Sequence, residues 1–252
     1  MSIKITIFGY GFVGKAHENV LKHEHDITIV DPAYKLTDPG DPDAVIIAVS
    51  TPQSAHGGQC YMDNVYDALK KVPEDIPVLI KSTISLEGWD YIERNFNHDI
   101  TFSPEFLRAA TALEDFENAK TLYFGGGDDV FWASLLWKEG RRMFRRDPRE
   151  LIMMKYCVNT FLATKVAFFN QIEELCDRAH IDYNNVKDLV QHDERIGNSH
   201  MDVTEQRGFG GHCFPKDTSA LLKTASREYE YNLSILQAAV DYNLLTRDWS
   251  ND

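Results

Sequence analysis

The stretch KITIFGYGFVG, residues 4–14, decides the fold of the first half of the chain. Its first part, Lys4–Phe8, has the apolar and β-branched character of a buried strand. A turn of the form G-x-G-x-x-G follows and leads into an apolar pattern at helical spacing near Phe12–His23. A strand, this turn and a helix in that order predict the first unit of a parallel α/β sheet.

The alternation of strand and helix patterns continues to about residue 148. Strands without polar alternation are buried on both faces, and strands that alternate with helices form right-handed βαβ units. We therefore expect an α/β fold that begins with a doubly wound, Rossmann-type parallel sheet in residues 1–148. Further strands are expected at Ile27–Asp31, Ala44–Val49, Val78–Lys81, Ile100–Phe102 and Thr121–Phe124, with helices near Asn64–Lys71 and Leu86–Asn95.

Residues 149–252 change to helical patterns and predict an all-helical second domain. Its first helix, Glu150–His180, has no internal Pro or Gly and would reach about 45 Å. A loop rich in Gly and Asn is expected over Arg195–Cys213. The other expected helices are Asn184–His192, Thr218–Arg227 and Leu233–Thr246.

Composition excludes several classes of partner. Lys and Arg number 26 and Asp and Glu 39, so the net charge is −13 and neither nucleic acid nor an anionic membrane is an expected partner. No run of 18 uncharged apolar residues predicts a membrane-spanning helix, and a strand beginning at Lys4 leaves no room for a signal peptide. These features favour a cytoplasmic protein.

The four cysteines form no C-x-x-C pair, so neither a zinc site nor any other metal site is expected. Without an export signal, disulfides are not expected either. Cys157 and Cys176 lie in apolar helical patterns and are expected to be small buried residues.

The glycine turn is the first candidate site. Gly9 permits a tight turn, Gly11 lets the backbone approach a pyrophosphate, and Gly14 allows close packing of helix on strand. Asp31 ends the second strand, where an acid accepts hydrogen bonds from ribose hydroxyls and repels a 2′-phosphate. NAD is therefore favoured over NADP, with FAD and a turn without ligand as alternatives. The expected contacts are Gly9, Tyr10, Gly11, Phe12, Val13, Gly14 and Asp31.

The second candidate site is GFGGHCFPKD, residues 208–217. Its glycines allow close approach of backbone to a ligand, and Pro215 can begin a helix directly after Cys213. The positive end of the helix dipole and Lys216 would favour the thiolate. Beside an NAD domain, this pattern suggests an aldehyde bound as a thiohemiacetal and oxidised to a thioester.

Three more residues are site candidates by position. Lys155 and Asn159 lie four apart on an otherwise apolar helix and share a face, although a solvated edge would explain them equally well. Glu105 follows a short strand at the carboxyl edge of the sheet, where ligands bind in open α/β sheets. Its alternative role is that of an acid in the first turn of a helix.

Together these motifs resemble the UDP-glucose/GDP-mannose dehydrogenase family, and most closely its UDP-glucose 6-dehydrogenases. The resemblance covers nearly the whole chain, and its most specific parts are SPEFLR and the decapeptide that contains Cys213. The matching motifs, in family order, are GYGFVG (9–14) with Asp31, VSTP (49–52), KST (81–83), SPEFLR (103–108), Lys155-x-x-x-Asn159, RIG (195–197) and GFGGHCFPKD (208–217).

The resemblance implies a four-electron oxidation of a sugar C6 alcohol to the carboxylate with two NAD per turnover, UDP-glucose being the favoured substrate. Cys213 would carry the thiohemiacetal and thioester, Lys155 and Asn159 would stabilise the oxyanion, and Glu105 would help to activate water. Thr83 and Asp217 would hold water and neighbouring groups. Thr51, Thr83, Lys216 and Lys35 are further expected NAD contacts. The expected substrate contacts are Glu105, Phe106, Leu107, Arg108, Lys155, Asn159, Arg195, Phe209, Gly210 and Gly211.

The chain also departs from the family pattern. Ala109 stands where the family has a Glu beside the nicotinamide, and we expect this short form to lack the C-terminal nucleotide-binding domain. The resemblance implies a homodimer through the helical domain, with Arg195 reaching the partner's substrate. The apolar residues near Leu233–Thr246 suggest the last helix as the interface. Two alternatives stay open: a regulatory partner of a full-length homologue, and a short hydroxyacid-type dehydrogenase, which would not need Cys213.

Overall fold

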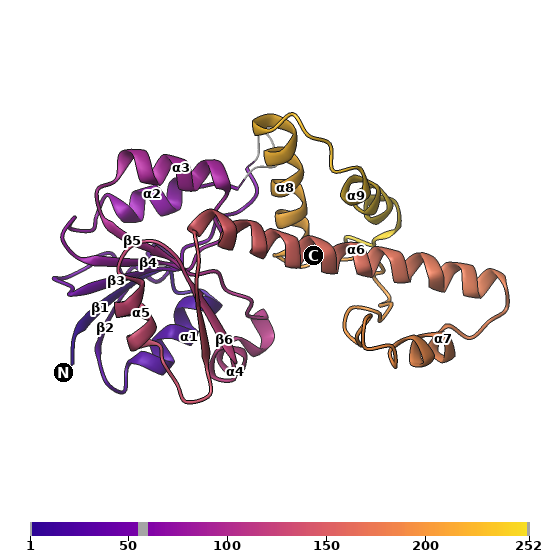
Figure 1. The fold of residues 1–252 in the computed structure, drawn as a ribbon, viewed down its shortest axis with the longest axis horizontal. Helices are drawn as coiled ribbons and strands as arrows, with labels where there is room; N and C mark the ends of the chain where they lie inside the picture. The colour runs from indigo at the N-terminus through magenta and orange to yellow at the C-terminus, as the bar shows by residue number, and fades with distance from the viewer. Residues whose placement is uncertain (1, 55–59, 251–252) are drawn as a thin grey trace. The chain divides into compact units, whose positions relative to one another are not determined.

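The computed structural model describes residues 2–54 and 60–250 (Figure 1). Two compact units separate inside one long helix: the described residues up to Lys155 form the first unit, and those from Tyr156 onward form the second.

The first unit is built on a parallel sheet of five strands in the order β2-β1-β3-β4-β5, which confirms the predicted fold class. The order reverses between β1 and β3, so the turn after β1 lies where open α/β sheets bind their ligands. The elements of this layer are β1 (Lys4–Phe8), α1 (Phe12–Leu21), β2 (Asp26–Val30), β3 (Ala44–Ile47), α2 (Asp63–Leu69), β4 (Pro77–Ile80), α3 (Leu86–Asn95) and β5 (Asp99–Phe102).

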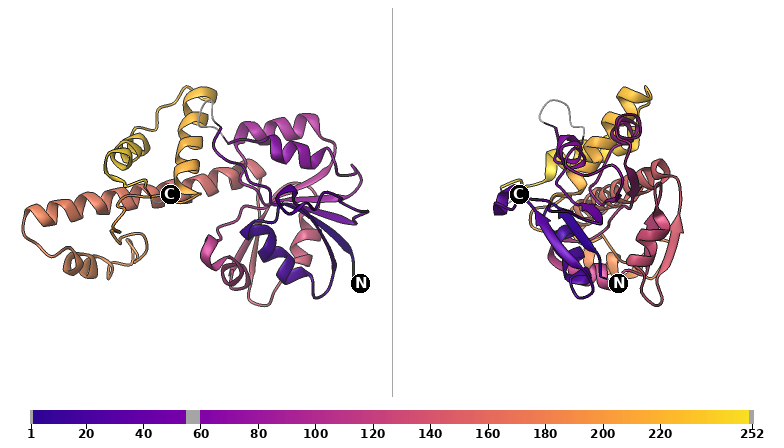
Figure 2. Two further views of the ribbon diagram at one scale, coloured as in Figure 1. Left: turned by 180° about the vertical axis from the view of Figure 1, so that it is seen from behind. Right: turned by 90° about the vertical axis from the view of Figure 1, so that its left-hand side faces the viewer.

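Helices cover both faces of the sheet, with α2 and α3 on one face and α1 on the other (Figures 1 and 2). Ile5, Ile46 and Leu79 point toward α1 and share one core with Ala16 and Leu21 of that helix. Burial on both faces explains why the strand sequences are continuously apolar.

The sequence reading of residues 109–147 was incomplete. The strand β6 (Thr121–Phe124) does not extend the main sheet; it pairs in parallel with β7 (Arg142–Arg145), which was not predicted. The helices α4 (Ala112–Glu117) and α5 (Asp129–Leu135) were missed as well. The helices α4 and α5 are short, and β7 is largely exposed with an arginine at each end. None of the three therefore shows the apolar period that identifies a helix or strand in a sequence.

The second unit is helical, as predicted. It contains most of α6 (Pro148–Arg178), α7 (Tyr183–Val190), α8 (Phe214–Glu228) and α9 (Ser234–Thr246). Ala163 and Ala167 of α6 pack against Ala239 of α9, and Phe169 and Cys176 of α6 pack in a second cluster that includes residues of α7. The helix α6 is long and apolar enough to cross a membrane by length and composition alone, but 56% of that window is buried in the protein. Burial of this extent is typical of a core helix.

The core of the first unit contains a histidine with a depressed pKa. His17 of α1 is fully buried, its Nδ1 lies 2.9 Å from the Val13 carbonyl oxygen, and its ring packs on Phe116. Among the described residues its Nε2 has no hydrogen-bond partner. Burial, together with the charge of Lys81, lowers the pKa of His17 to about 3.

Because the folded-state pKa of His17 is depressed, the unfolded chain binds the extra proton between about pH 6.5 and pH 3. The contribution of neutral His17 to the unfolding free energy is therefore fully present above about pH 6.5 and is lost as the pH falls toward 3. We expect His17→Leu to flatten the pH dependence of the unfolding free energy over pH 6.5–5 by up to about 1.4 kcal/mol per pH unit. Urea denaturation of both proteins across this range is the measurement. Parallel curves for the two proteins would contradict the assignment.

Candidate functional site

The carboxyl ends of the five parallel strands bring the predicted site residues of the first unit to one edge. The glycine turn follows β1, Asp31 follows β2, and Thr51 lies just beyond β3. Thr83 lies just beyond β4, and SPEFLR begins directly after β5. Parallel pairing thus gathers segments that lie far apart in the sequence.

Within the glycine turn, the three glycines are required for different reasons. Gly9 has φ +93°, and a Cβ there would lie 2.5 Å from the Ala48 oxygen. A Cβ on Gly14 would lie 2.0 Å from the Gly9 oxygen, so helix–strand packing excludes it. A Cβ on Gly11 would meet no described atom within 4 Å. The chain's own packing does not require a glycine at position 11, whereas a pyrophosphate approaching the start of α1 would, so this turn fits NAD.

Asp31 lies against this turn. Its Oδ2 accepts a hydrogen bond from the Tyr10 amide at 2.7 Å, and its Oδ1 accepts one from the Ala33 amide at 2.9 Å. These contacts fix a carboxylate beside the expected ribose position. Lys35 is exposed at the end of a short 3-10 turn, with φ 60°.

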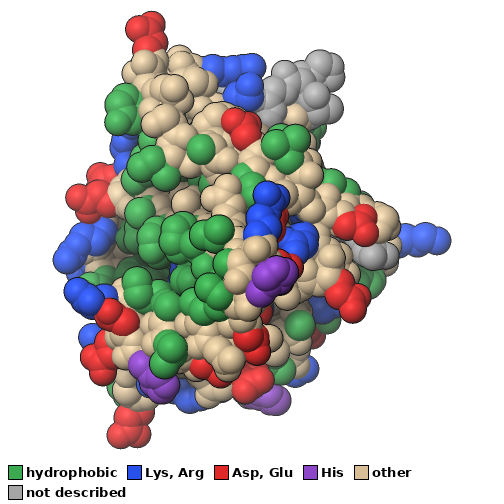
Figure 3. Space-filling model, turned by 90° about the vertical axis from the view of Figure 1, so that its right-hand side faces the viewer, with side chains coloured by type: hydrophobic (Ala, Val, Ile, Leu, Met, Phe, Trp, Pro, Cys, Tyr) green, Lys and Arg blue, Asp and Glu red, His purple; other side chains and the backbone are tan. Residues whose placement is uncertain are grey.

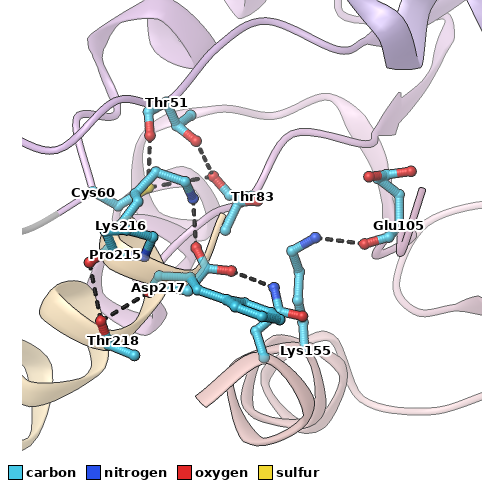
Figure 4. Close-up of polar contacts among 11 residues, drawn as sticks. Thr51, Cys60, Thr83, Glu105, Lys155, Pro215, Lys216, Asp217 and Thr218 are labelled. Carbon is cyan, nitrogen blue, oxygen red and sulfur yellow. Dashed lines mark hydrogen bonds and ion pairs between the residues drawn. The ribbon is translucent and has the colours of Figure 1, made fainter. Parts of the chain in front are cut away.

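Thr51 and Thr83 are in direct contact, because the Thr51 hydroxyl donates to the Thr83 carbonyl oxygen at 2.7 Å (Figure 4). Cys60, which no sequence motif singles out, lies beside this pair, with its Sγ 3.4 Å from the same oxygen. Cys60 is buried, and the only sequence clue was its proximity to VSTP.

Glu105 and Lys155 meet through the backbone (Figure 4). The Lys155 ammonium donates to the Glu105 carbonyl oxygen at 2.5 Å, and the Glu105 carboxylate accepts from the Leu107 amide at 3.2 Å. Both side chains are at least 90% buried. Burial raises the pKa of Glu105, and the charges of Lys155 and Lys81 oppose that rise. A carboxyl group with a raised pKa is suited to general acid–base chemistry near neutral pH.

Phe106 and Arg108 of SPEFLR are more exposed to solvent than Glu105. Phe106 is exposed and lies under the Lys155 ammonium, whose nitrogen is 5.5 Å from the ring centroid. Arg108 pairs with Asp115 of α4 at 2.5 Å, so its charge is already engaged within the unit.

In the second unit, Asp217 is fully buried and binds two of the predicted site residues (Figure 4). Asn159 donates to its Oδ2, and Lys216 contacts its Oδ1, each at 2.6 Å. Asn159 lies one helical turn beyond Lys155 on α6. The shared face predicted from their spacing is therefore used for buried polar contacts, and the alternative of a solvated edge is wrong.

Cys213 occupies the cap position immediately before α8, and Pro215 lies in the first turn, as the sequence predicted. The Cys213 carbonyl oxygen accepts from the Asp217 amide at 2.8 Å. A thiol at this place lies at the positive end of the helix dipole, which favours its anion.

The glycine loop before Cys213 is held by a residue that the sequence analysis did not identify. Asn243 of α9 is buried, accepts from the Phe209 amide at 2.6 Å and donates to the Phe209 oxygen at 2.9 Å. A Cβ on Gly208 would collide with Asn243, and one on Gly210 would collide with Arg247. A Cβ on Gly211 would meet no described atom within 4 Å. Gly208 and Gly210 therefore allow the loop to pack closely against Asn243 and Arg247, whereas no described side chain packs on the backbone at Gly211.

The side chains of Arg195 and Cys157 are both exposed. Arg195 lies on an exposed loop, pairs with Asp193 at 2.6 Å, and has an 87% exposed side chain. Cys176 is buried as expected, but Cys157 is exposed, so that part of the expectation was wrong. Cys157 lies one helical turn from both Met153 and Phe161, on the exposed face of α6, whereas Cys176 packs in the cluster with Phe169 and Tyr183.

Comparison with known proteins gives consistent results along most of the chain. Residues 34–136 match the NAD binding domain of the UDP-glucose/GDP-mannose dehydrogenase family, and residues 149–244 match its central domain. A UDP-glucose 6-dehydrogenase of Rickettsia bellii (strain RML369-C) is 32% identical over 216 residues, 80% of this chain and 49% of the relative. UDP-glucose 6-dehydrogenase TuaD of Bacillus subtilis (strain 168) is 31% identical over 95% of this chain and 53% of the relative. The chain thus spans about half the length of these curated relatives.

Solved structures share the fold. A UDP-glucose dehydrogenase from the hyperthermophilic archaeon Pyrobaculum islandicum superposes with a TM-score of 0.82 at 24% identity, over 97% of this chain and 68% of that one. The 3-hydroxyisobutyrate dehydrogenase of Mycobacterium tuberculosis superposes with a TM-score of 0.74 at 15% identity, over 100% and 98% of the two chains. Fold alone therefore does not separate the two classes of dehydrogenase, and the motifs must. With both domain matches in place, the chain belongs to the UDP-glucose/GDP-mannose dehydrogenase family.

Proposed function

We propose that the chain catalyses the NAD-dependent oxidation of a nucleotide-sugar C6 alcohol to the carboxylate, with UDP-glucose as the first substrate to test. The observation that carries this proposal is the place of Cys213, at the cap of α8 and behind a glycine loop held by α9. A short hydroxyacid-type dehydrogenase would need no such thiol. Residues 1–148 would bind the cofactor, and residues 149–252 would carry the nucleophile.

When bound, NAD supplies the acceptor of two electrons in each of the two oxidations. In our proposal the Cys213 sulfur adds to the aldehyde carbon and forms a carbon–sulfur bond, giving a thiohemiacetal. The second oxidation converts this to a thioester. Water then breaks the carbon–sulfur bond, which releases the carboxylate and returns the thiol.

The other side chains of the proposed site would stabilise developing charge, accept a proton from water or position that water. Lys155 and Asn159 would stabilise the oxyanion that develops on the sugar oxygen. Glu105 would accept a proton from the hydrolytic water, and the raised pKa of its carboxyl supports that role. Thr83 and Asp217 would hold water and neighbouring groups. Asp31, placed beside the turn by Tyr10, would select NAD over NADP.

The substrate would contact Glu105–Arg108 of SPEFLR and the loop Phe209–Gly211. Arg195 would bind the substrate of a partner subunit, for which its exposure and its place on a loop are suitable. We propose the cytoplasm as the compartment, because the proposed reaction needs Cys213 as a reduced thiol.

We further propose a homodimer, with α6 as its main interface. Exposed apolar side chains recur along one face of this helix: Met153, Phe161, Phe168 and Leu175. The last helix, α9, also exposes apolar side chains, namely Ile235, Leu244 and Leu245, while its Leu236 and Ala239 pack inside the unit. Figure 3 shows hydrophobic side chains gathered on one face of the molecule. Contiguous exposed apolar surface of this kind marks association sites.

The first experiment measures NADH formation by the purified chain with UDP-glucose, UDP-N-acetyl sugars and GDP-mannose. We expect UDP-glucose to give the product acid and Cys213→Ser to abolish its formation while NAD binding is kept. Cys157→Ser is the matched control, because that thiol is exposed but lies outside the proposed site. Full activity of Cys213→Ser would refute the assignment. NAD binding without turnover of any sugar would favour a regulatory partner of a full-length homologue.

The loop held by α9 gives a second prediction. Asn243→Leu leaves the Phe209 amide and carbonyl unpaired, so we expect the unfolding free energy to fall by about 2 kcal/mol or more. We also expect kcat to fall about tenfold or more, because the loop that positions Cys213 loses its anchor. Gln237→Leu, on the exposed face of α9, is the control and should change neither quantity. Unchanged kcat in Asn243→Leu would show that the loop needs no anchor.

The interface is tested by light scattering at micromolar concentration. We expect a mass twice 28.8 kDa for the wild type and a mass near 28.8 kDa for Phe161→Glu, because a buried unpaired charge opposes association. Leu245→Glu places the same charge on α9 and should leave the dimer intact. A monomeric wild type would refute the dimer, and a dimer lost only in Leu245→Glu would make α9 the interface.

A further inference from the structure

Lys81 carries a buried ammonium group whose hydrogen-bond partners among the described residues are all neutral. It follows the last residue of β4, and only 2% of its surface is exposed. Its Nζ donates to the Ser103 hydroxyl oxygen at 3.0 Å and to the Pro104 carbonyl oxygen at 3.4 Å. A buried charge held by neutral oxygens alone is costly, so a nearby opposite charge must contribute to its retention.

The Glu105 carboxylate supplies an opposite charge in the same region, because both residues line one cavity and each charge acts on the other group's pKa. Lys81 holds the carbonyl of Pro104, and Lys155 holds the carbonyl of Glu105, the next residue in the chain. Two buried ammonium groups from distant parts of the chain thus donate hydrogen bonds to consecutive backbone carbonyls of one loop. The Glu105 carboxylate folds back onto the Leu107 amide and stays inside the same buried region.

A cavity adjoins this arrangement. It measures about 330 Å³, and its lining includes Lys81, Glu105, Phe106, Arg108, Asp115 and Tyr123. Lys81 and Glu105 therefore share one space inside the first unit.

We propose that Lys81 is a positioning residue for Glu105: together with Lys155 it fixes the backbone carbonyls of Pro104 and Glu105, and its charge stabilises the Glu105 carboxylate. The proposal rests on the proposed function, in which Glu105 activates the hydrolytic water. It assigns to the Lys of KST an electrostatic role distinct from that of Thr83.

The charges around the pair determine the direction of each effect. Burial raises the pKa of Glu105, the charges of Lys155 and Lys81 lower it, and Asp115 of α4 raises it. Burial lowers the pKa of Lys81 to about 8, while Glu105 raises it and Lys155 and Arg141 lower it. His17, which also lies near Lys81, is neutral at the relevant pH because its pKa is about 3. Lys81 is thus charged below about pH 8, and Glu105 loses this support above it.

The test measures the ionisation of Glu105 directly. The chain is labelled with ¹³C in the glutamate carboxyl groups, and the Glu105 resonance is assigned as the one missing in Glu105→Gln. We expect Lys81→Met, which removes the charge but keeps the length of the side chain, to raise the pKa of Glu105 by about one unit or more. Ser103→Ala removes a hydrogen-bond acceptor but leaves the charge, so it should shift that pKa by less than about 0.3 units.

A pKa that is unchanged in folded Lys81→Met would overturn the proposal, as would equal shifts in both variants. If Lys81→Met does not fold, the wild type decides. Loss of the Lys81 proton near pH 8 should move the Glu105 resonance a second time, and a resonance without an inflection there would overturn the proposal.

These measurements need neither substrate nor turnover, so they separate failure of this inference from failure of the proposed function. If the chain is active, the acid limb of thioester hydrolysis in Lys81→Met should move to higher pH with KM for UDP-glucose unchanged. A Lys81 that served only for packing would lower the melting temperature and leave this profile in place.

Discussion

Parallel pairing of five strands is the constraint on which the candidate site depends. In a parallel sheet every strand runs the same way, so every carboxyl end arrives at the same edge. The glycine turn, Asp31, Thr51, Thr83 and SPEFLR all follow strand ends, and hydrogen-bonded strand registers hold those ends in place. A change of register at one strand would move its loop out of the group without altering a single site residue.

Buried polar groups provide the second level of organisation. Asp217 binds Asn159 and Lys216, Lys155 binds the Glu105 carbonyl, and Asn243 binds both backbone groups of Phe209. Each contact is made away from water, where an unpaired partner would be costly, so each contact admits few alternative geometries. These contacts therefore fix the positions of the candidate site residues within their own unit.

The helix α6 contributes residues to both compact units. Its first two turns lie in the sheet unit and carry Lys155, and the remainder forms the backbone of the helical unit and carries Asn159. Lys155 and Asn159 lie four residues apart in this helix, so their spacing along it follows from the helical repeat. Its inner face supplies two small cores, while its exposed face keeps Phe161 and Phe168 in contact with solvent.

The sequence by itself determined the features that arise from local rules. Strand and helix periods identified β1 to β5 and the five described helices of ten or more residues, and the steric needs of Gly9 and Pro215 located the two candidate loops. The tertiary structure alone decided which side chains meet. Asn243 lies 34 residues from Phe209, and no period or motif connects them. Cys157 and Cys176 occupy similar apolar patterns, yet only one of them is buried. The role of Lys81 depends on Ser103 and Pro104, which a neighbouring strand brings to it. Burial and long-range contacts result from packing between elements, and this packing is not encoded in the pattern of any one element.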